Sequence, residues 1–280
     1  MNAFKLCPYS IWIASILLIA TISCKDELDK VKSVDDELAI MKSSTLAEGI
    51  LDEELVTFDE ATISAEEGRE KSHCPTVEKD IEAKTVTLDF GTECVSEIGR
   101  KRSGKVIVNY SGSIQTGAIK TITFDSYYVN GHRLSGTIVV TSLGRDDEGN
   151  ITTERTLDDF IILFESGELF TINGSTTRVW IAGEGDGIPG NEQFEITGSY
   201  DGEDDKGNTF TRQITSPIIA DWGCLSEDKF VRVSGEITMT INIGPNETVR
   251  VLDYGDGECD NTVTVTINGQ TFTISVEQPD

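Results

Sequence analysis

From about residue 72 onward the chain alternates between apolar and polar positions with a period of two. In residues 237–243 the odd positions are apolar and the even positions polar, and the same alternation recurs in residues 262–267 and 271–276. A period of two places the apolar side chains on one face of a strand and the polar ones on the other. Strands with one buried and one solvated face are typical of antiparallel sheets, because parallel sheets require unbroken apolar runs and intervening helices.

Asn-Gly pairs separate several of these runs. Asn130-Gly131, Asn173-Gly174 and Asn268-Gly269 each lie between two alternating segments. This pair favours the positive φ angles of a two-residue hairpin turn. The pattern therefore predicts an all-β fold, an antiparallel meander of roughly a dozen strands, either as a sandwich or as a curled, open, barrel-like sheet. The sequence does not decide between these two forms.

Residues 25–70 have a different character. They contain 15 Asp or Glu against 5 Lys or Arg, and Phe58 is their only aromatic residue. Such a composition favours a solvated segment over a packed core. We therefore expect an acidic tether over residues 24–71 and one all-β domain over residues 72–280. A transient helix within the tether is indicated by a stripe at helical spacing and a residue suited to cap it: Val31, Val34, Leu38, Met41 and Ser33.

The first residues have the order of an export signal. Lys5 precedes an apolar run over residues 11–22, which is followed by Ser23 and Cys24. This run is too short for a membrane-spanning helix, which needs about 20 apolar residues, and fits a secretory signal peptide over residues 1–23. A cysteine directly after a small residue resembles the lipobox of bacterial lipoproteins, which implies that Cys24 carries a lipid. Plain secretion with an incidental Cys24 is the alternative.

The charge restricts the possible partners. The formal net charge is −26 with a pI near 4.3, and loss of the signal, which carries only Lys5, would make the charge −27. Nucleic-acid binding needs Lys and Arg to displace counterions, so we expect no nucleic-acid partner. The same charge disfavours anionic membrane surfaces. Contact with a membrane is therefore expected through the lipid anchor.

Four cysteines remain beyond the signal and Cys24. An even number in an exported chain suggests two disulfides. The predicted pairs are close in sequence: Cys74–Cys94 and Cys224–Cys259. A zinc site is disfavoured because no Cys-x-x-Cys is present and only His73 lies near a cysteine.

No set of residues for catalysis stands out. Beyond the signal the chain has only two histidines, His73 and His132, and no Gly-x-Ser-x-Gly elbow. We therefore expect no enzymatic activity. The one basic cluster is Arg100-Lys101-Arg102, which we expect in a loop after Cys94.

Calcium is the one candidate cofactor. Calcium takes six to eight oxygen ligands from flexible acidic loops, and one acidic, glycine-containing stretch has suitable side chains: Asp253, Asp256, Glu258 and Asp260. The alternative is that these residues only form turns, for which Asp, Asn and Gly are the usual choice.

Several runs resemble a lipoprotein family of the Bacteroidetes, chiefly of flavobacteria. They are residues 99–104, 123–131, 178–180 and 252–261. In that phylum an acidic stretch after the lipid cysteine looks like a signal for export to the cell surface, and Lys25-Asp26-Glu27 fits it. The resemblance carries over no functional residue. From these features together we expect an outer-membrane lipoprotein facing the cell exterior. We expect it to have a binding or structural role, with a surface protein, glycan or lipid as its partner. The alternative is a lipid or lipoprotein carrier with an apolar concave sheet face.

Overall fold

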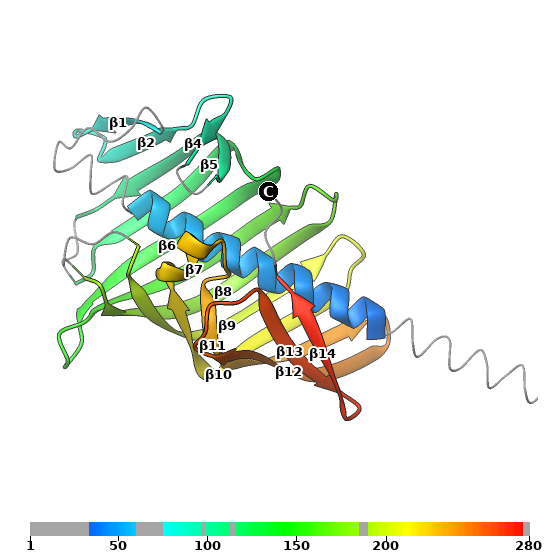
Figure 1. The fold of residues 1–280 in the computed structure, drawn as a ribbon. Helices are drawn as coiled ribbons and strands as arrows, with labels where there is room; N and C mark the ends of the chain where they lie inside the picture. Colours follow the sequence, from blue (N-terminus) through cyan, green and yellow to red (C-terminus); the bar gives the residue numbers. More distant parts are fainter. Residues whose placement is uncertain (1–33, 60–74, 97–98, 113–115, 185–189, 277–280) are drawn as a thin grey trace, which may run out of the picture. The chain divides into compact units, whose positions relative to one another are not determined.

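The computed structural model describes residues 34–59, 75–96, 99–112, 116–184 and 190–276. The chain divides into two compact units, Met1–Met41 and Lys42–Asp280. Residues 34–41, the described part of the first unit, are helical. In the second unit residues 42–59 are helical, and we call them the acidic helix (Figure 1). The remaining elements are strands and one short 3₁₀ helix: β1 (Thr76–Asp80), β2 (Thr85–Asp89), β3 (Cys94–Val95), β4 (Lys101–Tyr110), β5 (Ile119–Val129), β6 (His132–Arg145), β7 (Ile151–Leu163), β8 (Leu169–Ala182), β9 (Gln193–Asp204), β10 (Thr209–Asp221), η1 (Trp222–Glu227), β11 (Arg232–Ile243), β12 (Asn246–Asp256), β13 (Thr262–Ile267) and β14 (Gln270–Ser275).

The strands form one antiparallel meander, as the alternation predicts. The order is β1-β2-β4 and then every strand in turn to β14, while β3 pairs with β4 beside this path. The sheet ends at β1 and β14 and is not closed. Of the two predicted forms, the structure has the open, curled sheet, and this sheet curves around the acidic helix (Figure 1).

Two of the three predicted Asn-Gly hairpins are confirmed. Asn130-Gly131 joins β5 to β6 and Asn268-Gly269 joins β13 to β14, all four residues with positive φ. The prediction for Asn173-Gly174 is wrong, because this pair lies inside β8. A Cβ on Gly174 would stand 2.5 Å from the carbonyl oxygen of Ser199 on β9. Glycine is therefore required here by a close strand approach and not by a turn.

The prediction of a solvated tether is wrong for residues 42–59. These residues pack in the hollow of the sheet, and most of their side chains are buried. Phe58 lies 5.7 Å from the ring of Tyr127 and 6.2 Å from that of Phe124, in edge contacts. Gly49 lets the helix approach Phe230 closely, because a Cβ there would lie 2.1 Å from the ring. The predicted cap Ser33 and the other parts of the tether, 24–33 and 60–71, lie outside the described residues.

Candidate functional site

Arginines line the helix-facing side of the sheet. Among the described residues, six arginines contact carboxylates of the acidic helix: Arg100, Arg102, Arg155, Arg178, Arg212 and Arg232. Their helix partners are Glu48, Asp52, Glu53, Glu54 and Asp59. Four of these carboxylates are fully buried, so each requires a cationic partner to offset the loss of hydration.

At the centre of this interface, two carboxylates one helical turn apart form four ion pairs with three arginines. Glu48 forms ion pairs with Arg212 at 2.9 Å and with Arg232. Asp52, one turn later, accepts from Arg155 Nη1 at 2.7 Å and from Arg232 Nε at 2.8 Å. Residues four apart lie on the same helix face. Arg232 therefore bridges both carboxylates and links β11 to the helix.

A second group lies against β4. The Nε of Arg100 donates to Glu53 at 2.9 Å, and the Nη2 of Arg102 donates to Glu54 at 2.6 Å. The hydroxyl of Tyr127 also donates to Glu54. Arg100 and Arg102 are 5% and 4% exposed. The prediction that this basic cluster lies in a loop is wrong for Lys101 and Arg102, which are part of β4. Arg102 is also buried against the helix.

Burial and ion pairing shift the pKa values of Asp52 and Glu53 in opposite directions. Burial alone raises the pKa of Asp52, but Arg232 and Arg155 bring that pKa below its ordinary value of 3.8. For Glu53 burial dominates and raises the pKa above 4.5, even though Arg100 opposes the shift. Asp52 is thus held as a carboxylate by two cations, while Glu53 is the less well compensated charge.

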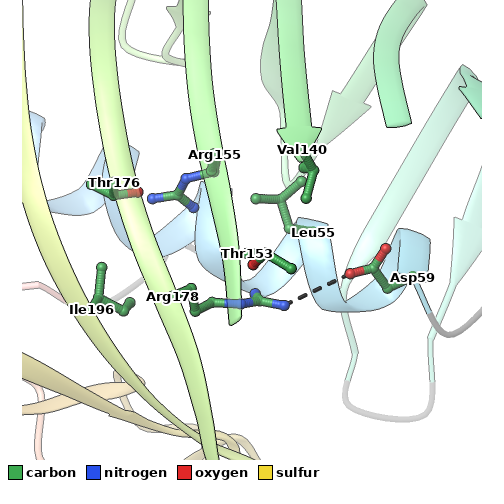
Figure 2. Close-up of a pocket in the computed structure, with 8 residues that line it drawn as sticks. All are labelled: Leu55, Asp59, Val140, Thr153, Arg155, Thr176, Arg178 and Ile196. Atoms are coloured by element: carbon green, nitrogen blue, oxygen red, sulfur yellow. Dashed lines mark ion pairs between the residues drawn. The ribbon is translucent and has the colours of Figure 1, made fainter. Parts of the chain in front are cut away.

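The end of the acidic helix borders a small cavity. Asp59 accepts from Lys120 Nζ at 2.7 Å and lies 3.7 Å from Arg178 Nη2. The cavity lies beside these groups, between the helix and strands β7 and β8, and Arg155 also lines it (Figure 2). Its volume is about 10 Å³.

On the opposite face of the sheet, strands β7 to β11 carry mostly polar side chains. One row of aligned side chains crosses five strands from β7 to β11: Thr156, Ser175, Ser199, Gln213 and Thr238. Beside it, over β8 to β10, lies a groove of about 520 Å³ lined by hydroxyl, amide and carboxylate groups such as Thr171, Asn173, Asp201 and Glu203. These groups are suited to hydrogen bonding with a polar ligand.

One predicted disulfide is confirmed. Cys224 and Cys259 form a disulfide between residues that are 35 positions apart in the sequence. Cys94 is buried and disulfide-bonded. Its predicted partner Cys74 and the proposed lipid site Cys24 lie outside the described residues.

The structure does not gather the predicted calcium ligands. Asp253, Asp256, Glu258 and Asp260 are all exposed. Asp253 accepts from the backbone of Gly255, and Asp260 accepts from that of Thr262, as in turns. Within the described ranges no three His, Cys, Asp or Glu side chains lie close enough to hold a metal ion. Calcium binding stays a prediction.

The buried arginines were not predicted, although the sequence contains a signal for them. Phe210, Arg212 and Ile214 share one phase of the alternation in β10, so an arginine occupies the apolar face. An arginine in that phase needs a buried anion. The anion that Arg212 contacts, Glu48, lies in the acidic segment that was interpreted as a tether.

His132 gives a prediction for the pH dependence of stability. Burial lowers the pKa of His132 below 6.5, against the opposing effect of Glu165. The unfolded chain therefore binds a proton before the folded chain does, so the free energy of unfolding should fall as the pH drops below 6.5. We expect His132→Gln to reduce this slope between about pH 7.5 and 5.5, where ordinary carboxyl groups titrate little.

Urea unfolding at a series of pH values measures this effect. His132 accepts a hydrogen bond from the backbone of Glu165, and glutamine retains an acceptor. An unchanged slope in the variant would contradict the assignment.

The comparisons with known proteins add no relative. The chain matches no family model, and no curated protein and no solved structure is significantly similar to it. No helix in the described part of the chain has the length and apolar character needed to cross a membrane.

Proposed function

We propose that this chain is a lipid-anchored lipoprotein of the outer membrane, displayed on the cell surface, whose β domain has a binding or structural role. The observation that carries the binding role is the polar outward face with its groove of about 520 Å³. The helix-facing side of the sheet is occupied by the acidic helix, so the outward face is the one available to a partner. A glycan or a polar protein surface suits its hydroxyl, amide and carboxylate groups.

The disulfide and the signal-like N-terminus support export. Disulfides persist in oxidising compartments, and Cys224–Cys259 is such a bond. The sequence around Cys24 supports lipidation, and the acidic residues after it support surface display. The buried titratable groups support a non-catalytic role, because the carboxylates Glu48 and Asp52 are buried and bound by arginines.

A lipid or lipoprotein carrier is the alternative role. The open, curved sheet favours it, since a curved sheet can enclose an apolar ligand. In this structure the hollow of the sheet is filled by a helix held through ion pairs. A carrier would therefore have to release this helix before it takes up a ligand.

The anchor can be tested by membrane fractionation. We expect Cys24→Ser to move the protein from the membrane pellet to the soluble fraction, because serine lacks the thiol that would carry the lipid. Without acyl chains the protein has no stable attachment to the membrane. Cys7→Ser, in the predicted signal, is the matched control and should leave the protein in the pellet. Membrane retention of Cys24→Ser would refute the anchor.

The binding face can be tested by photo-crosslinking on intact cells. A photoreactive residue at Gln213, which is exposed on the outward face, should give adducts detectable as a mass increase. The same residue at Glu78, exposed on edge strand β1, is the control and should give none. Equal labelling from both positions would argue against a specific outward binding face.

A further inference from the structure

The small cavity beside the end of the acidic helix has apolar walls and a cationic lining. Leu55 from the helix, Val140 from β6 and Ile196 from β9 form the apolar part. Arg155 and Arg178, from neighbouring strands β7 and β8, supply positive charge (Figure 2). The rest of the lining consists of Asp59, Thr153 and Thr176. A volume of about 10 Å³ has room for one particle of about the size of a water molecule.

Each of these arginines has a buried N–H group that no described residue accepts. Arg155 donates from Nη1 to Asp52 and from Nη2 to Tyr200, but its Nε has no acceptor. Arg178 has a buried Nη1 without an acceptor. An unsatisfied buried donor on a charged group is costly, so both groups favour an additional acceptor.

The charge at this end of the interface is not balanced. Asp59 is the nearest carboxylate to Arg178, but it lies 3.7 Å away and is held by Lys120 at 2.7 Å. Asp52, the partner of Arg155, is shared with Arg232. Two guanidinium groups and one carboxylate, that of Asp59, therefore line the cavity, and this carboxylate is shared with Lys120.

The environment of Arg178 adds to this excess. Its guanidinium lies over the ring of Phe194 at 4.1 Å, which partly offsets its charge but offers no hydrogen-bond acceptor in the ring plane. Burial lowers the pKa of Arg178, and Asp59 opposes this only in part. The positive charge is thus held in a poorly hydrated place.

We propose that this cavity binds one small monovalent anion, chloride or a halide of similar size, between the guanidinium groups of Arg155 and Arg178. Such an ion accepts hydrogen bonds from Arg155 Nε and Arg178 Nη1 and offsets the excess positive charge. A water molecule would accept the hydrogen bonds but leave the charge uncompensated, and the small volume favours a monatomic ion over phosphate or sulfate.

The test is thermal unfolding of the full-length chain in potassium chloride and in potassium gluconate at one ionic strength. Chloride should raise the Tm saturably, by about 5 °C at high occupancy. Arg178→Gln should abolish the difference between the two salts. Arg145→Gln, which removes an exposed partner of Glu184, is the matched control and should retain it.

A second measurement needs no variant. Binding should broaden the chloride NMR signal in the presence of the wild-type protein, and bromide should reverse the broadening by competition. Equal Tm values of the wild type in the two salts, or no broadening, would overturn the proposal and indicate a water-filled cavity. If Arg178→Gln does not fold, the wild-type NMR result decides.

Discussion

Arg232→Met should lower the free energy of unfolding by about 3–5 kcal/mol, because it leaves two buried carboxylates without their shared cation. Arg232 is fully buried and contacts both Glu48 and Asp52. Methionine fills part of the space of the arginine side chain, so less of the loss should come from a cavity than with alanine. Guanidinium unfolding followed by circular dichroism gives the measurement.

An exposed ion pair provides the control for this variant. Arg145 pairs with Glu184 at 2.6 Å, but its side chain is 49% exposed. Exposed pairs contribute about 0–1 kcal/mol, so Arg145→Met should have little effect. Equal losses for the two variants would show that the buried network does not hold the helix.

Replacement of both Cys224 and Cys259 by alanine should lower the free energy of unfolding by about 4 kcal/mol. The bond closes a loop with a sequence separation of 35 residues, and its removal gives the unfolded chain more conformational freedom. Cys224 lies in η1 and Cys259 follows β12, so the bond also fixes the connection before β11 to the end of β12.

The control is the same comparison with a reducing agent present. Under reduction the wild type and the double alanine variant should differ by much less, because neither has the bond. Equal stability of the two proteins under oxidising conditions would mean that the disulfide contributes nothing measurable.

The strands could be predicted from the sequence because their signal is local. Alternation in residues 262–267 and 271–276 and the Asn268-Gly269 pair between them define a hairpin within about 15 residues, the range over which such patterns are read. The Asn173-Gly174 pair has the same letters but lies in a strand. Its glycine is required by Ser199, whose approach is a tertiary contact invisible in the local sequence.

The helix-to-sheet interface could not be predicted in the same way. The composition of the acidic segment predicts that it is solvated. A composition counts the residues of one segment and contains no information about partners elsewhere in the chain. The partners are remote: Glu53 pairs with Arg100, 47 residues away, and Glu48 with Arg232, 184 residues away. The in-phase arginine of β10 marks a buried cation but does not identify its anion. The excess of acid in the whole chain offers too many candidates.

During synthesis of the chain, the contacts within the meander can form earlier than the contacts of the acidic helix. Each strand from β4 to β14 pairs with its neighbour along the chain, so the sheet can grow hairpin by hairpin at a low cost in loop closure. The helix is synthesised before every strand, yet Glu48 and Asp52 need Arg232 on β11. The segment made first is therefore among the last to reach its final position. Until β11 is in place, Glu48 has only Arg212 and Asp52 only Arg155 among these cations, so the helix cannot complete its central ion pairs.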